Sequence, residues 1–401
     1  MTDVAERLEE LRDRGLYRRL RLVGGPQGPR VLLDGREVLL LCSNDYLGLS
    51  GHPLVREAAA EAAIRWGTGA GASRLISGTM EPHLLLERDL AEFKGYEAAL
   101  LFGSGYLANS GAVAALAGRG EIVFSDELNH ASIVDGCRLS RAETFVYRHA
   151  DVEHLAWGLR QAGGRAALIV TDGVFSMDGD VAPLAALAEL AGRHGCRLMV
   201  DEAHATGAVG PGGRGSVAAA GLADEVDLVV GTLGKALGSY GAYVCANRQL
   251  IDYLVNSARP FIFSTAPPPP MVAAADAALE LLVGDPGLAE RLRANAAGLR
   301  AAFVEEGLAV GGSETQIVPL HVGDAGAAMR TSERLLERGV FAQGIRPPTV
   351  PEGSSRLRFT VMATHEPAEL RRAAAVVGEV TRELGLGADP AATESAPPLA
   401  A

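Results

Sequence analysis

The stretch that decides the fold is VVGTLGKALGS, residues 229–239. The largely apolar run 226–230 predicts a buried strand, and a glycine-rich turn then presents Lys235 between small residues. A desolvated lysine loses part of its preference for the charged form, and a neutral amine can attack an aldehyde. Taken alone, the pattern is more often an ordinary loop lysine near the end of a strand, so it needs support from elsewhere in the chain.

That support comes from RLMVDEAHATG, residues 197–207, where a second predicted strand ends in charged and polar residues. Asp201 lies at the carboxyl end of this strand, and His204 follows three residues later. A lysine, an acid and a phosphate cradle are what pyridoxal phosphate (PLP) needs from a protein: the lysine for its aldehyde, the acid for its ring nitrogen and the cradle for its phosphate. The cradle should therefore be found elsewhere in the sequence.

The segment GSGY, residues 103–106, lies between a predicted strand, 98–102, and a predicted helix, 107–117. Free backbone N–H groups and the positive end of the helix make this junction a phosphate site. Ser104 can add a hydroxyl group, and Tyr106 an aromatic wall. The same letters match a dinucleotide fingerprint, so an NAD-dependent dehydrogenase is an alternative, but that interpretation leaves Asp201 and Lys235 without roles.

Strands and helices alternate from about residue 98 to residue 235, which predicts an α/β fold with a mostly parallel sheet and helices on both faces. Ligands of such sheets bind beyond the carboxyl ends of the strands. The residues predicted to gather at this edge are His130, Ser176, Asp201, His204 and Lys235. The sequence therefore predicts one site built from several strand ends.

The chain is expected to have four parts. Residues 1–45 form an N-terminal arm with an amphipathic helix over 4–21 that breaks at Gly15, and residues 46–284 form the large PLP-binding domain. Shorter strands and helices over 285–386 predict a smaller C-terminal α+β domain. The Ala- and Pro-rich tail, 387–401, is expected to be disordered.

Composition excludes several classes of protein. The 401 residues are 48% hydrophobic and 21% charged, and the net charge of −12 argues against nucleic acid as the main partner. The four cysteines have no metal-ligand spacing, so no metal site is expected. The N-terminal residues are charged and do not resemble a signal peptide, which predicts a cytoplasmic protein. No apolar run reaches about 18 residues, so no membrane-spanning segment is expected.

Five motifs together resemble the α-oxoamine synthases, PLP enzymes of the aspartate-aminotransferase fold, also called PLP fold type I. The motifs are SNDYLG at 43–48, NH at 129–130, FSMDG at 175–179, DEAH at 201–204 and TLGK at 232–235. The resemblance extends from about Arg18 to Leu384. It implies an α/β large domain, a smaller α+β domain and acyltransferase activity.

The resemblance implies a role for each residue around the cofactor. Lys235 would bind the PLP aldehyde and move protons, Asp201 would pair with the ring nitrogen, and His204 would bond the phenolic oxygen. His130 would stack over the ring and contact the substrate. The other cofactor-binding residues implied are Gly105, Tyr106 and Thr232 around the phosphate, Ser176 near the ring oxygen, and Ser264 with Thr265, which would reach the phosphate of a neighbouring subunit. A homodimer with shared sites is therefore expected.

On the substrate side, the resemblance implies that Arg358 binds the carboxylate of the amino acid and that Thr349 and Asn44 line the pocket. Arg18 would meet the far carboxylate of a pimeloyl chain. The run IRPPTVP, 345–351, favours a member that joins L-alanine to pimeloyl-CoA or pimeloyl carrier protein in biotin biosynthesis. A sister enzyme such as glycine C-acetyltransferase, 5-aminolevulinate synthase or a sphingoid-base synthase is the nearest alternative. A non-catalytic subunit of such a synthase would lack the lysine.

Overall fold

The computed structural model describes residues 3–386, and the tail expected to be disordered lies outside this range. The chain forms two compact units. The large unit comprises residues 44–176 and 180–290, and the small unit comprises the residues before 44, residues 177–179 and the residues after 290. The four-part domain division drawn from the sequence stays a prediction, and each unit is described separately below.

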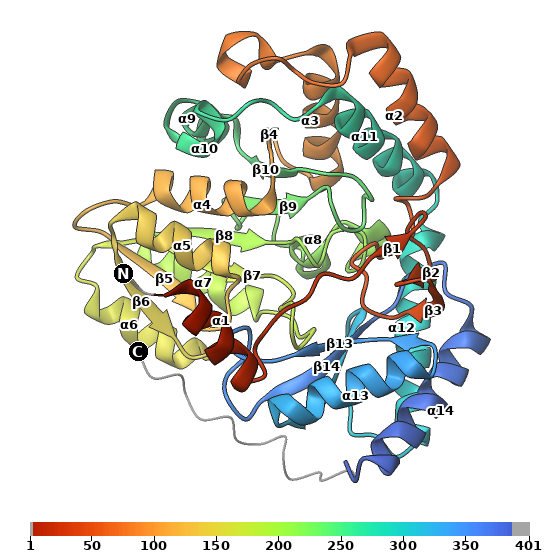
Figure 1. Cartoon of the computed structure of the whole chain (residues 1–401). Coiled ribbons are helices and arrows are strands. Elements are labelled where there is room, and N and C mark those ends of the chain that lie inside the picture. Colours follow the sequence, from red (N-terminus) through yellow and green to blue (C-terminus); the bar gives the residue numbers. More distant parts are fainter. Residues whose placement is uncertain (1–2, 387–401) are drawn as a thin grey trace. The chain divides into compact units, whose positions relative to one another are not determined.

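The large unit is built on a seven-stranded sheet with the order β4-β10-β9-β8-β7-β5-β6 (Figure 1). Only β10 runs antiparallel to its neighbours, which confirms the mostly parallel sheet predicted from the sequence. The strands are β4 (Ala98–Phe102), β5 (Ile122–Asp126), β6 (Glu143–Tyr147), β7 (Ala166–Asp172), β8 (Arg197–Asp201), β9 (Leu228–Thr232) and β10 (Ala242–Ala246).

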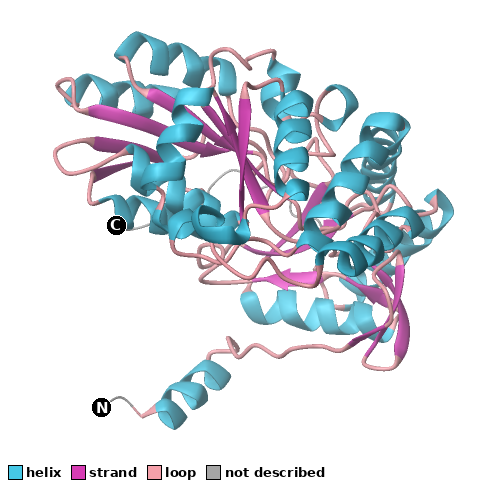
Figure 2. Ribbon diagram, turned by 90° about the horizontal axis from the view of Figure 1, so that it is seen from above, coloured by secondary structure: helices cyan, strands magenta, loops and turns pink. Residues whose placement is uncertain are grey.

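Helices cover both faces of this sheet (Figure 2). The helices of this unit are α2 (Pro53–Trp66), the π-helix η1 (Arg74–Gly78), α3 (Glu81–Lys94), α4 (Gly105–Leu116), α5 (Ala131–Ser140), α6 (Val152–Gln161), α7 (Leu184–His194), the 3₁₀ turn η2 (Pro211–Gly213), α8 (Ser216–Ala220), α9 (Arg248–Ser257), α10 (Arg259–Ile262) and α11 (Pro269–Gly284). Apolar residues of α4, α5 and α9, among them Val113, Ile133 and Leu254, pack against strand residues such as Val170 and Val230. Burying each such side chain stabilises the fold by about 1.5–3 kcal/mol, so the strands that carry the predicted site residues are held in a well-packed core.

The small unit contains two further sheets. One has the order β1 (Val23–Gly24), β2 (Arg30–Leu33), β3 (Arg36–Leu40), β12 (Val340–Phe341), and the other has the order β11 (Ile317–Gly323), β14 (Ser355–Thr360), β13 (Gln343–Ile345). Its helices are α1 (Val4–Asp13), α12 (Gly287–Glu305), whose first turn is grouped with the large unit, α13 (Ala325–Glu337) and α14 (Pro367–Glu383). Strands β2 and β3 form a hairpin, with both turn residues, Asp34 and Gly35, at positive φ.

One local prediction was wrong. The arm helix ends at Asp13 and does not continue to residue 21, and α1 has no buried residue. In the glycine-rich segment 67–78, residues 74–78 form one π-helical turn. Gly78 makes this turn feasible, because a Cβ atom there would lie 2.1 Å from the carbonyl oxygen of Ala72. Within residues 3–386, no helix is long and apolar enough to cross a membrane.

Candidate active site

Lys235 lies in a closed loop that follows β9. The loop is held by backbone hydrogen bonds, among them Gly238 N to the Lys235 carbonyl at 2.9 Å and Ser239 N to the Leu233 carbonyl at 2.8 Å. Gly207, at φ +79°, brings the chain after β8 against this loop, because a Cβ atom there would lie 2.4 Å from Cβ of Ala236. The segments that carry His204 and Lys235 are therefore packed directly together.

Lysine is rare in this chain. Of the 37 lysine and arginine residues, only Lys94 and Lys235 are lysines. Lys94 is buried, with 1% of its side chain exposed, and its Nζ donates to a Glu202 carboxylate oxygen, to Thr206 Oγ1 at 3.0 Å and to the Arg214 carbonyl at 2.7 Å. Because Lys94 is fully engaged, Lys235 is the one lysine placed for chemistry at the strand ends. The small number of lysines and the burial of Lys94 together favour Lys235 as the reactive amine.

Asp201 ends β8, and its carboxylate is fixed by neighbours on both oxygens. Asn109, on α4, donates from Nδ2 to Asp201 Oδ2 at 2.6 Å, and the backbone N–H of Ala203 donates to Oδ1 at 2.8 Å. The same Asn109 amide also donates to Ser132 Oγ at 2.9 Å. Only 5% of Asp201 is exposed, so it is a buried, oriented acid suited to pairing with a protonated ring nitrogen.

His204 is oriented by a hydrogen bond with Tyr46. Its Nδ1 lies 2.6 Å from the hydroxyl oxygen of Tyr46, and that hydroxyl donates to Asn44 Oδ1 at 3.1 Å. A tyrosine hydroxyl has one proton, so donation to Asn44 leaves His204 Nδ1–H as the donor to Tyr46. Asn44 is thus linked to His204 through Tyr46, whose role the sequence did not indicate, while its contact with a substrate stays a prediction.

His130 and Asp172 respond electrostatically to the predicted catalytic pair. Desolvation and then the charge of Lys235 lower the pKa of His130, while Asp201 opposes the shift. Burial and then the charge of Asp201 raise the pKa of Asp172 well above its usual range, while Lys235 opposes the shift. Lys235 and Asp201 therefore both act on the same two groups, which places all four at one edge of the sheet. Asp172, the last residue of β7, was not among the predicted site residues.

The predicted phosphate cradle follows β4. Ser104 is the N-cap of α4, and its hydroxyl accepts from the backbone N–H of Leu107 at 3.3 Å. At Gly105 nothing lies within 4 Å of the position that a Cβ atom would take, so the helix start is open to a ligand. Tyr106 is 44% exposed and donates its hydroxyl proton to Asp135, which leaves the ring beside the cradle.

The other predicted cofactor-binding residues lie in loops of the large unit. Thr232 ends β9 and donates from Oγ1 to the Gly241 carbonyl at 3.1 Å, while Ser176 lies in the loop after β7. Ser264 and Thr265 follow α10, and Thr265 pairs with Ser73 of the glycine-rich segment. Thr265 is exposed to solvent.

The remaining predicted substrate residues belong to the small unit. Arg358 is a buried residue of β14, and it acts electrostatically on Cys42. Arg18 is exposed and lies close enough to Arg346 to lower the pKa of that guanidinium, after the larger effect of desolvation. Thr349 is exposed, and its N–H donates to the Arg346 carbonyl at 3.1 Å. Their approach to Lys235 stays a prediction.

The large unit thus offers an amine, a buried acid, two imidazoles and an open helix start. These groups fit a flat heterocycle that carries an aldehyde, a ring nitrogen and a phosphate. In the described part of the chain, no cluster of three or more His, Cys, Asp or Glu residues is placed to hold a metal ion.

The fold and the site define a member of a known enzyme class: the chain belongs to the class I and II aminotransferase family, whose family model matches residues 36–377. Among its relatives, 8-amino-7-oxononanoate synthase of Geobacter sulfurreducens is 56% identical over 96% of this chain and 99% of its own length. A serine palmitoyltransferase variant from S. paucimobilis, solved with a bound PLP–myriocin aldimine, has a TM-score of 0.91 and 34% identity, covering 96% of this chain and 98% of its own. The 8-amino-7-oxononanoate synthase of Francisella tularensis has a TM-score of 0.75 and 27% identity, covering 86% and 98%.

Proposed function

We propose that this chain is a PLP-dependent acyltransferase that condenses L-alanine with a pimeloyl thioester. The products are 8-amino-7-oxononanoate, carbon dioxide and the free thiol, a step of biotin biosynthesis in the cytoplasm. The observation that carries the proposal is the 56% identity to 8-amino-7-oxononanoate synthase over nearly the full length of both chains. Serine palmitoyltransferase shares the fold at 34% identity, which supports the chemistry but not its substrate.

PLP, when bound, supplies an electron sink for the carbanion formed at the alpha carbon of the amino acid. The chain supplies the remaining functions. Lys235 would bind the aldehyde and move the alpha proton, and Asp201 would keep the ring nitrogen protonated. An ion pair at about 4 Å is worth roughly 4 kcal/mol at an effective dielectric of about 20, which is ample for that purpose. His204 would bond the phenolic oxygen, and His130 would stack over the ring.

The backbone around Gly105 would hold the phosphate, with Tyr106 and Thr232 beside it, and Ser176 would lie near the ring oxygen. Asn109, which no sequence pattern indicated, holds Asp201 in the orientation that this role needs, with a hydrogen bond of 2.6 Å. The protein therefore supplies orientation and proton transfer, while the cofactor supplies the electronic stabilisation.

We assign the substrate carboxylates to arginines of the small unit. Arg358 binds the carboxylate of alanine, with Thr349 and Asn44 on the substrate side, and Arg18 binds the far carboxylate of the pimeloyl chain. Arg346 supports that last role, because its guanidinium interacts with Arg18 and donates to the Tyr17 carbonyl at 2.8 Å. Two neighbouring guanidinium groups repel each other and are stabilised by an anion between them.

The discriminating experiment compares acyl donors and amino acids. The purified enzyme should turn over L-alanine with pimeloyl-CoA or pimeloyl carrier protein, with release of free thiol, and should prefer this pair to glycine with acetyl-CoA, to glycine with succinyl-CoA and to serine with palmitoyl-CoA. If glycine and acetyl-CoA give the highest kcat/KM, the chain is a glycine C-acetyltransferase and the proposal is wrong. The two pimeloyl donors compared at equal concentration identify the acyl carrier.

The chain is proposed to act as a homodimer with shared sites, in which Ser264 and Thr265 reach the partner's phosphate. Leu75, Ile76 and Phe263, beside that loop, are 50%, 80% and 71% exposed, and exposed apolar side chains grouped in this way are typical of a protein–protein interface. Light scattering should give twice the monomer mass. Ile76→Asp should yield monomers with little activity, whereas Val146→Asp, on the exposed edge strand β6, should not. A fully active monomer would contradict shared sites.

A further inference from the structure

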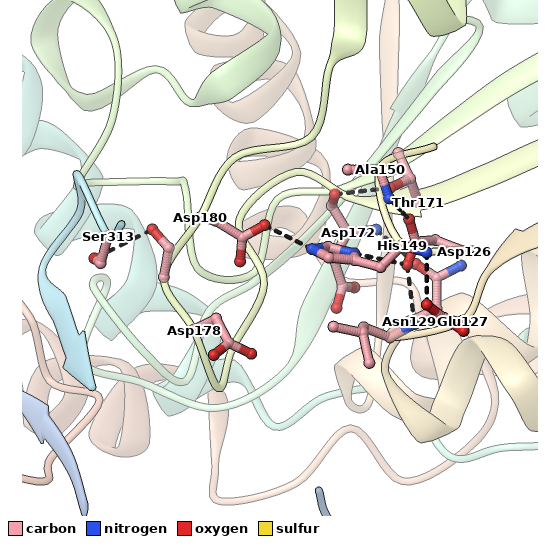
Figure 3. A network of polar contacts seen from close by, with 12 residues as sticks. Asp126, Glu127, Asn129, His149, Ala150, Thr171, Asp172, Asp178, Asp180 and Ser313 are labelled. Atoms are coloured by element: carbon pink, nitrogen blue, oxygen red, sulfur yellow. Dashed lines mark hydrogen bonds and ion pairs between the residues drawn. The ribbon is translucent and has the colours of Figure 1, made fainter. Parts of the chain in front are cut away.

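His149 lies between two carboxylates of the large unit. Its Nδ1 is 3.0 Å from Asp126 Oδ1, and its Nε2 is 2.8 Å from Asp180 Oδ2 (Figure 3). Because each ring nitrogen faces a carboxylate oxygen, both nitrogens must donate, and only the protonated imidazolium has two donors. Phe175 packs edge-on against the ring, with centroids 4.4 Å apart. The arrangement holds one positive charge between two negative ones.

Asp126 is the start of the loop that carries His130. This carboxylate is 2% exposed, and it also accepts from the N–H of Leu128 at 2.9 Å and of Ala150 at 2.9 Å. Three residues on, Asn129 donates to the Val170 carbonyl at 2.8 Å and accepts from Asp172 N at 2.9 Å. The loop from 126 to 130 is therefore fixed at one end by His149 and at the other by β7.

Asp180 closes the loop that carries Ser176. The backbone N–H of Phe175 donates to the Asp180 carbonyl at 3.0 Å, and Val174 pairs with Val181. The second carboxylate oxygen of Asp180, Oδ1, is buried and has no hydrogen-bond partner among the residues that the structure describes. The Asp180 carboxylate thus depends on His149 for its stabilisation.

We propose that His149 is a positioning residue, whose imidazolium joins the His130 loop to the Ser176 loop and so sets the spacing of the two side chains that contact the cofactor ring. The inference rests on the proposed function, since the roles of His130 and Ser176 come from it. Nothing in the sequence pattern pointed to His149, which follows a strand and precedes a helix in an ordinary turn.

The charge state of His149 follows from its surroundings. Burial alone would lower the pKa of His149, but hydrogen bonds to Asp126 and Asp180, with the charges of both, outweigh it and raise the pKa to about 10. Glu127 adds a further negative charge, because its carboxylate accepts from the His149 backbone N–H at 2.7 Å. Arg148, the nearest cation along the chain, is paired with Asp151. The imidazolium therefore persists through neutral pH.

The test compares His149→Gln, which removes the charge, with His149→Arg, which keeps a cation able to contact two carboxylates. The holoenzyme carrying His149→Gln should lose up to about 10²-fold in kcat, the cost of misplacing catalytic groups by about 1 Å, with KM changed much less. His149→Arg should recover most of the kcat. Near pH 10 the wild type should lose activity as His149 loses its proton, and His149→Arg should lose less. His194→Gln, at the end of α7, is the control and should leave kcat unchanged.

Two readouts do not depend on activity. The ¹⁵N shifts of His149 in histidine-labelled wild type should be those of an imidazolium at pH 8, and this measurement needs no variant that might misfold. The difference in unfolding midpoint between wild type and His149→Gln should be greatest below pH 6.5 and shrink towards pH 10, because a raised pKa stabilises the fold only while the proton is bound. A neutral His149 at pH 8, or a His149→Gln enzyme with wild-type kcat and pH profile, would overturn the proposal. If the wild type itself lacks activity with alanine and pimeloyl thioesters, the proposed function fails while the shift measurement still decides the charge of His149.

Discussion

Lys235→Ala should abolish turnover, with a loss in kcat of at least about 10²–10⁴-fold, the range for removing a positioned acid–base group. The loss should reach the upper end or exceed it, because the same amine also binds the cofactor aldehyde. No second lysine can replace it, since Lys94 is 1% exposed and bonded to three acceptors. The measurement is the steady-state release of thiol from pimeloyl-CoA in the presence of L-alanine.

Borohydride reduction gives the matched control for this variant. In wild type, reduced PLP should be found on the peptide that contains Lys235, and in Lys235→Ala no lysine peptide should be labelled. The variant should keep the wild-type unfolding midpoint in the absence of cofactor, so that lost activity is not lost fold. Label on Lys94, or a variant within tenfold of wild-type kcat, would refute the assignment of Lys235.

Lys94→Met should lower the free energy of unfolding by about 3–5 kcal/mol. Removing one partner of a buried ion pair leaves the other charge uncompensated, and that penalty has this size. Glu202, also 1% exposed, would keep only its bonds from Ser216 Oγ at 2.9 Å and Val217 N at 2.7 Å. Urea unfolding at constant m-value measures the loss.

An exposed ion pair on the same unit serves as the comparison. Arg193 and Glu189 on α7 are 60% and 69% exposed, so Arg193→Met should cost no more than about 1 kcal/mol. Adding Glu202→Gln to Lys94→Met should recover part of the stability, because the double variant has no buried unpaired charge. If Lys94→Met and Arg193→Met cost the same, the buried pair does not stabilise the fold as argued.

Much of the large unit could be predicted because its sequence is locally consistent. The strand 98–102 has the predicted bounds, and the helix after residue 105 begins where glycines and Ser104 signal an N-terminus. The parallel topology alone led to the prediction that His130, Ser176, Asp201, His204 and Lys235 gather beyond strand ends. The mostly parallel sheet and the family resemblance were confirmed.

The remaining strands and the long-range contacts of the site could not be predicted from local sequence patterns. β6 is an edge strand whose residues 143–146 are largely exposed, and its sequence has no strict apolar–polar alternation. Strand β10 follows the point where the alternation of strands and helices ends. Asn109 and Asp201 are 92 residues apart, and His149 and Asp180 are 31 apart. Partners at such separations meet only when the sheet is assembled, and no spacing rule in the sequence encodes them.

The scarcity of lysine has a practical consequence. Acylating reagents selective for amines have few targets on this chain, because arginine supplies nearly all of its positive charge and the Lys94 side chain is buried. Apart from the α-amino group, such a reagent meets a single side chain, and that side chain stands in the proposed catalytic centre. Occupancy of the centre could therefore be followed by mass spectrometry of the intact protein, as protection of one modification.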